Sequence, residues 1–137
     1  RNALLAFLFA LFLLFLRSPG LCLAPLLRNP FLFEQSETLW KGGTPLRPTI
    51  DDYLALMREQ RELLEQTFPS RMAMVHARKF LAWYSAGFPG CHEYRRKLFT
   101  LSDPEVLWAE TFEFFERNGR DRSLEFMSQP FLMGGHG

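Results

Sequence analysis

Two cysteines and three histidines are the strongest candidates for nucleophiles or metal ligands in this 137-residue chain. Cys91 directly precedes His92, but adjacent residues rarely turn their side chains toward one another, so no Cys–His nucleophile is predicted. His76 and His92 are isolated, and no CxxC or HExxH motif indicates a metal site. Cys22 lies in a short apolar run and is expected to pack. With no phosphate loop and no triad spacing, the sequence predicts neither catalytic nor metal-binding residues.

Basic residues give a stronger signal than the nucleophiles. The whole chain carries a net charge of +1, which excludes a polycation. Residues 71–97, however, hold six cations and one acid, Glu93, so this window carries +5 and the remainder −4. A phosphate backbone facing one side of the protein would favour this asymmetry, and a solvated basic face over an aromatic core would explain it equally well. The cations are Arg71, Arg78, Lys79, Arg95, Arg96 and Lys97, and Phe80, Trp83, Tyr84, Phe88 and Tyr94 alternate with them.

Helical spacing predicts that these cations lie in a bundle of four elements over residues 49–118. Thr49 is a good N-cap for a helix that ends near Pro69. Ser70 is expected to cap the next helix, which runs to about Ala86, and a short helix over 92–99 follows. Ser-Asp-Pro-Glu at 102–105 is typical of a capping box and opens the last helix, which ends at residues 118–119.

Residues upstream of the bundle fall into two segments. Asn29 followed by Pro30 predicts the start of a helix over about 30–41, which the glycines at 42–43 end. Residues 3–16 are an uninterrupted run of Leu, Phe and Ala, shorter than the roughly 20 residues of a membrane-spanning helix. A signal peptide, a membrane segment, a buried helix and a misread gene sequence all stay open for this run.

Two motifs in the basic window resemble the helical C-terminal domain of the bacterial tRNA-dihydrouridine synthases. Residues 77–90 read ARKFLAWYSAGFPG, in which an Arg-Lys pair leads into a Trp-Tyr pair and a glycine, and the basic segment EYRRKLF follows at 93–99. Upstream, LLRNPFLF at 26–33 looks like the join between the last strand and last helix of that family's TIM barrel. The resemblance covers roughly residues 21–117.

The resemblance implies an FMN-dependent flavoenzyme that uses NADPH to reduce the C5–C6 bond of uridines in tRNA. In this family the barrel holds the flavin and supplies a cysteine acid, while cations of the helical domain contact the tRNA backbone. Matched by motif, the RNA-binding candidates are Arg78, Lys79, Arg95, Arg96 and Lys97.

The sequence departs from the family pattern in its first half. A TIM barrel needs about 200 residues, and at most 48 precede the bundle, so neither Cys22 nor Cys91 takes the acid role. Leu23, Ala24 and Pro25 stand where the family has a Gly-Arg pair that holds the flavin phosphate. The expected fold class is therefore mainly α. An apolar segment (1–20) and a remnant of the last barrel strand and helix (21–43) precede the helical domain (44–118), and a disordered tail (119–137) follows it.

Three functional hypotheses follow from these observations. The first is a cytoplasmic, truncated synthase whose bundle binds tRNA without catalysis, FMN, NADPH or metal. The second is a small membrane-tethered or secreted helical protein whose basic surface faces lipid headgroups. The third is a protein-interaction module that uses exposed Phe and Trp side chains.

Overall fold

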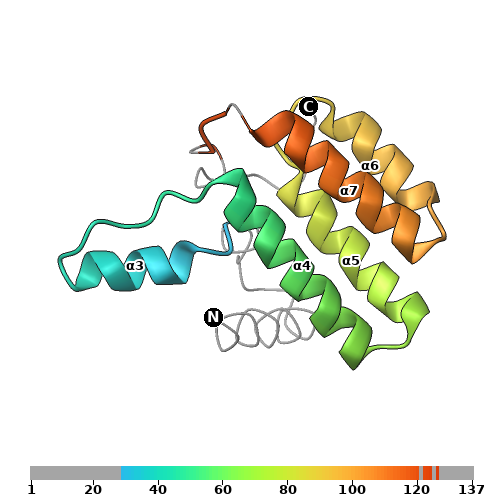
Figure 1. The fold of residues 1–137 in the computed structure, drawn as a ribbon, viewed down its shortest axis with the longest axis horizontal. Coiled ribbons are helices and arrows are strands. Elements are labelled where there is room, and N and C mark those ends of the chain that lie inside the picture. Colours follow the sequence, from blue (N-terminus) through green and yellow to red (C-terminus); the bar gives the residue numbers. More distant parts are fainter. Residues whose placement is uncertain (1–28, 121, 125, 127–137) are drawn as a thin grey trace, which may run out of the picture.

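The computed structural model describes residues 29–120, 122–124 and 126, and within these ranges every regular element is a helix. The mainly helical fold class is thereby confirmed, whereas the apolar segment 1–20 and the expected barrel strand lie outside the described residues. None of the described helices combines the length and apolar character needed to cross a bilayer. The helices are α3 (Leu32–Trp40), α4 (Ile50–Thr67), α5 (Ser70–Tyr84), α6 (Cys91–Thr100) and α7 (Pro104–Gly119), shown in Figure 1.

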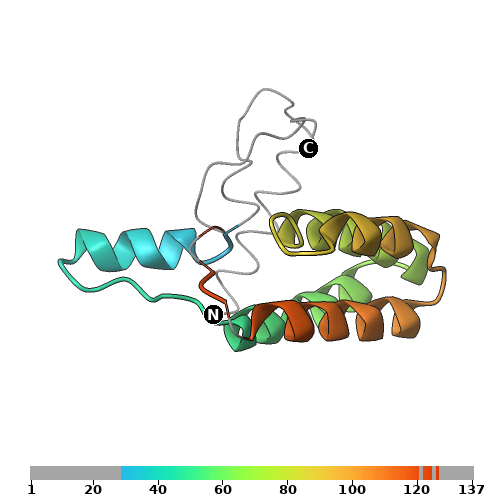
Figure 2. The same ribbon diagram turned by 90° about the horizontal axis from the view of Figure 1, so that it is seen from above.

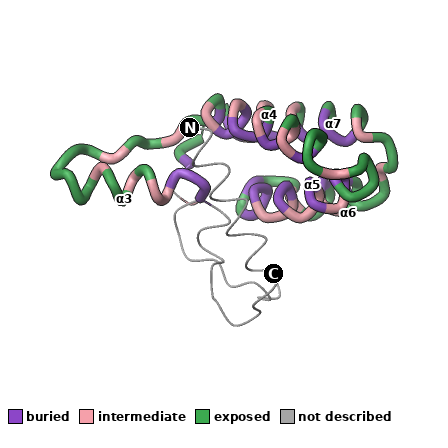
Figure 3. Tube along the Cα trace, turned by 90° about the horizontal axis from the view of Figure 1, so that it is seen from below, coloured by how far each residue is buried: buried purple, intermediate pink, exposed green. Residues whose placement is uncertain are grey.

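The last four helices form a two-layered bundle. Figure 2 shows α4 and α7 in one layer and α5 and α6 in the other. Short connections join successive helices, as is usual for antiparallel neighbours. Helix α3 projects from one end of the bundle, and Figure 3 shows that most of its surface is exposed or only half-buried. Its final residue, Trp40, is 92% exposed.

Capping residues explain where α4 and α7, the two helices of one layer, begin. Thr49 and Asp52 form the reciprocal pair of a capping box before α4, because the Thr49 side chain accepts from the Asp52 N–H while the Asp52 carboxylate accepts from the Thr49 N–H at 2.8 Å. The predicted cap of α4 is therefore confirmed. Asp103 caps α7 by accepting from the N–H groups of Glu105 and Val106 at 2.8 and 3.3 Å.

Three predicted helix starts differ from the structure. The cap of α7 is Asp103 rather than Ser102, because Pro104 occupies the first helical position, where its missing N–H costs nothing. Ser70 is the first helical residue of α5 and makes no capping hydrogen bond, since Pro69 holds the N-cap position. Upstream, Asn29 accepts from the Phe31 N–H at 3.1 Å, so α3 begins two residues later than its Asn-Pro signal suggested.

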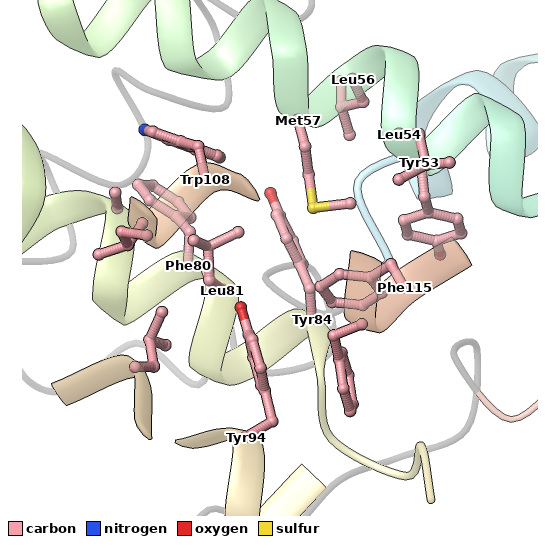
Figure 4. Close-up of a cluster of buried hydrophobic side chains, with 14 of the residues drawn as sticks. Tyr53, Leu54, Leu56, Met57, Phe80, Leu81, Tyr84, Tyr94, Trp108 and Phe115 are labelled. Atoms are coloured by element: carbon pink, nitrogen blue, oxygen red, sulfur yellow. The ribbon is translucent and has the colours of Figure 1, made fainter. Parts of the chain in front are cut away.

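Aromatic and aliphatic side chains from all four bundle helices fill the space between the layers (Figure 4). The Tyr94 ring of α6 stacks on Phe114 of α7 with centroids 4.2 Å apart. Its hydroxyl lies 2.9 Å from Thr111 Oγ1, and because Thr111 donates its own proton to Leu107 O, Tyr94 is the donor. This buried hydrogen-bond chain joins α6 to α7. The most deeply buried large side chains include Tyr53, Leu54, Met57, Leu64, Leu81, Leu98, Leu107 and Phe115.

Two described residues beyond α7 also pack on the bundle. Leu124 is buried, and the Phe126 ring contacts Phe88 edge to face with centroids 5.1 Å apart. Both lie inside the segment that the sequence predicted to be a disordered tail. Most of that segment is outside the described residues, but these two side chains belong to the hydrophobic core or its margin.

Candidate nucleic-acid interface

Helices α5 and α6 lie side by side and bring the two halves of the basic window together (Figures 1 and 2). Arg95 Nε donates to Ala82 O at 3.0 Å and to Ser85 Oγ at 3.2 Å, which joins the middle of α6 to the end of α5. Arg78 Nη2 donates to Leu101 O, which joins the middle of α5 to the end of α6. The earlier residue of α5, Arg78, pairs with the end of α6, and the later residue, Ala82, pairs with the middle of α6, so the two helices are antiparallel.

Arg78 and Arg95 are half-buried and serve the packing of the two helices. Each guanidinium donates to a carbonyl at the C-terminal end of the neighbouring helix, where carbonyls lack intrahelical donors and a cation is favoured by the helix dipole. The sequence nominated both residues for RNA contact. In the structure these donor groups hold α6 against α5.

Lys97 lies on the opposite side of α6, toward α7. Its Nζ is 2.6 Å from Glu110 Oε1, and both side chains are partly exposed. This ion pair offsets the Lys97 charge, so Lys97 presents less free charge to an anionic ligand than its residue type suggests.

Lys79 and Arg96 keep their charges free. Within the described part of the chain, neither side chain forms a hydrogen bond or an ion pair, and Arg96 is exposed while Lys79 is half-buried. Arg71, at the start of α5, is exposed and equally unpaired among the described residues. Arg71 lies about two turns before Lys79 on α5 and about 80° around the helix from it. Motif matching missed Arg71 because the family-like stretch begins at residue 77, although the charge count of the window includes it.

In the other layer, formed by α4 and α7, the cations have carboxylate or aromatic partners. Arg61 bonds to Glu65 at 2.8 Å and also to Glu105 of α7. Arg58 lies over the Phe112 ring, with its guanidinium carbon 5.0 Å from the ring centroid. Arg117 and Arg120 lie 3.7 Å from Glu113 and Glu116, respectively. The unpaired positive charge of the bundle is therefore concentrated on α5 and α6.

The isolated histidine and cysteine side chains form no reactive cluster in the described residues. His76 is buried beside the Phe68 ring, and burial, assisted by the nearby Lys79 charge, lowers the pKa of His76. Cys91 packs against the core while His92 is exposed, so the two side chains diverge as expected. No group of three or more potential ligands for a metal ion occurs among residues 29–120 and the few described beyond them.

Comparisons of the sequence with known proteins give matches to one family. A family model described as dihydrouridine synthase (Dus) matches residues 22–118. The chain is 31% identical over 83 residues to the "Probable tRNA-dihydrouridine synthase 1" of Synechocystis sp., covering 60% of this chain and 23% of that protein. It is 30% identical over 98 residues to the tRNA-dihydrouridine synthase B of Pseudomonas putida, covering 71% and 28% of the two chains. The chain thus spans about a quarter of the length of these relatives. No solved structure matches it.

Proposed function

The chain belongs to the dihydrouridine synthase family, and on this premise we propose that its bundle binds the tRNA backbone through the outer side of α5 and α6. We call this surface the α5–α6 face and define it by Arg71, Lys79 and Arg96. The observation that carries the proposal is the segregation of charge, because the cations of this face are unpaired while those of the opposite layer contact carboxylates or a ring.

Unpaired cations favour nucleic acid because they neutralise phosphates and release the counterions that phosphates hold. A cation already paired with a carboxylate must give up that partner first. Phosphate contacts position a protein without reading sequence, and paired RNA is recognised mainly by its shape and backbone. The names of the relatives point to tRNA as the nucleic acid.

Under this proposal, the five cations that the sequence predicted to bind RNA have three different roles. Lys79 and Arg96, together with Arg71, contact phosphates. Arg78 and Arg95 are positioning residues, which hold the two helices at the spacing the contact needs. Lys97 contributes weakly because Glu110 shares its charge.

Chemistry lies outside the role proposed for the bundle. The family resemblance assigns the reduction of uridine to a flavin-binding barrel, with FMN as cofactor and NADPH as reductant. Leu23, Ala24 and Pro25 offer no side-chain donor to a flavin phosphate, and Pro25 also lacks a backbone N–H, so these positions do not fit the group. The bundle therefore supplies binding and takes no part in hydride transfer. We propose a cytoplasmic location for the protein, in keeping with a tRNA ligand.

The test is fluorescence anisotropy of a labelled tRNA transcript with the full chain across a salt series. The double variant Lys79→Gln/Arg96→Gln removes two unpaired cations and should reduce the salt dependence, the slope of log K against log salt, by about 1.4 to 1.8. The same relation gives an affinity loss of about 100-fold at 50 mM salt and about tenfold at 200 mM.

A matched control removes the same amount of charge from paired positions. Lys41→Gln/Arg117→Gln deletes two cations that are paired with Glu37 and Glu113 in other parts of the molecule. This control should bind tRNA nearly as the unaltered chain does. Equal losses in both double variants would mean that overall charge, and not the α5–α6 face, governs binding. No measurable binding by the folded, unaltered chain would refute the proposal.

A further inference from the structure

One aromatic side chain on α6 stands apart from the hydrophobic core. Phe99 is 59% exposed and belongs neither to the core nor to the residues packed against it. No other described aromatic ring is in contact with it. Of the other exposed large apolar side chains in the described residues, Met72 lies near the start of α5, and the rest lie elsewhere: Leu39, Trp40 and Leu46 in or near α3, and Val106 on α7.

Helix geometry and the contacts of two arginines place Phe99 on the α5–α6 face. Phe99 follows Arg95 by one helical turn, so both project from the side of α6 that faces α5. Arg78 of α5 bonds to Leu101 O at the C-terminal end of α6. The turn of α5 that carries Arg78 and Lys79 therefore lies beside the C-terminal end of α6. Arg96 lies one turn before Phe99 on α6. An unpaired cation on each helix therefore lies within about one turn of the level of Phe99.

We propose that Phe99 stacks on an unpaired nucleobase of the bound RNA while Lys79 and Arg96 hold the phosphates on either side. This inference rests on the proposed function and specifies which part of the RNA the face contacts. An exposed ring among cations suits a single-stranded nucleic acid, since every base offers a π-face and the backbone supplies the complementary charge. Glu93, the acid of the window, lies about 120° around α6 from Phe99 and one turn before Arg96.

The experiment compares two RNAs and two substitutions in the full chain. A tRNA transcript offers unpaired loop bases, whereas a fully paired RNA duplex offers only backbone. Phe99→Leu keeps an apolar side chain and removes the ring, and it should weaken tRNA binding about tenfold. It should leave duplex binding and the salt dependence unchanged. Phe99→Trp should bind tRNA as tightly as the unaltered chain, because the larger ring of Trp also stacks.

The matched control is Val106→Ala, which removes an exposed apolar side chain from the opposite layer and should change binding to neither RNA. Since Phe99 lies outside the core, its variants should unfold at the same urea concentration as the unaltered chain. Unchanged tRNA binding by Phe99→Leu would overturn the stacking contact, and the proposed function would stand if Lys79→Gln/Arg96→Gln still lost affinity. Equal weakening toward tRNA and duplex would also overturn it. If the folded chain bound no RNA, both proposals would fail.

Discussion

Substituting Gln for either of two adjacent arginines in α6 should have different effects on stability and on tRNA binding. The Arg95 Nε–H is shared between two acceptors at the end of α5, whereas Arg96 is exposed and has no partner within the described residues. We predict that Arg95→Gln destabilises the bundle, because Gln is too short to reach both acceptors. We predict that Arg96→Gln leaves stability unchanged and weakens tRNA binding.

The size of the effect follows from the contacts of Arg95. Its guanidinium donates to Ala82 O at 3.0 Å and to Ser85 Oγ at 3.2 Å. Hydrogen bonds that involve a charged group contribute roughly 1.5–3 kcal/mol, and a cation near a helix C-terminus adds about 0.3–1 kcal/mol. Because Arg95 is only half-buried, we take the lower part of this range and expect a loss of about 2 kcal/mol. For a domain of this size that loss lowers Tm by roughly 8–16 °C.

The assay is urea and thermal unfolding followed by far-ultraviolet circular dichroism. Arg96→Gln should change the free energy of unfolding by less than about 0.5 kcal/mol, as surface substitutions usually do. Arg95→Lys serves as a second variant, since it keeps the charge and loses the planar donor group, and it should fall between the two. Equal stability of Arg95→Gln and the unaltered chain would refute the positioning role. So would equal destabilisation by the two Gln substitutions.

Three further predictions concern stability. Gly119→Ala should cost about 1–2 kcal/mol in urea unfolding, because the added Cβ would overlap the Ile50 side chain and lie 3.1 Å from its Cβ; an unchanged midpoint would show that the helix ends separate freely. Asp103→Ala should cost about 1 kcal/mol through loss of the α7 cap, and Ser102→Ala should cost almost nothing; the reverse order would restore the capping-box prediction. Burial lowers the pKa of His76 in the folded state, so the unfolded state binds the proton first and stability should decline as pH falls below about 6.5. A pH titration of unfolding checks this decline, which should be absent in His76→Leu.

Local signals predicted most of the helical framework. The capping box at Thr49 was confirmed, since both of its partners lie within one turn of the same helix. The starts of α5 and α7 each differ from the prediction by one residue, because Pro69 and Pro104 compete with the neighbouring serines for the cap and the first turn. The start of α3 was also displaced, since Asn29 caps a turn that precedes the helix.

For the candidate site, the sequence determined the distribution of charge, and the tertiary structure determined which cations are paired. Residue types alone determined the charge asymmetry of the 71–97 window and the helical spacing that carries it. Only the packed structure decided which cations are free, because the acceptors of Arg95 and Arg78 lie 13 and 23 positions away in the chain and the carboxylate partner of Lys97 lies on another helix. Periodicity describes one helix at a time, whereas pairing across helices depends on how those helices pack. Adjacent residues of the same type, Arg95 and Arg96, therefore acquire different roles.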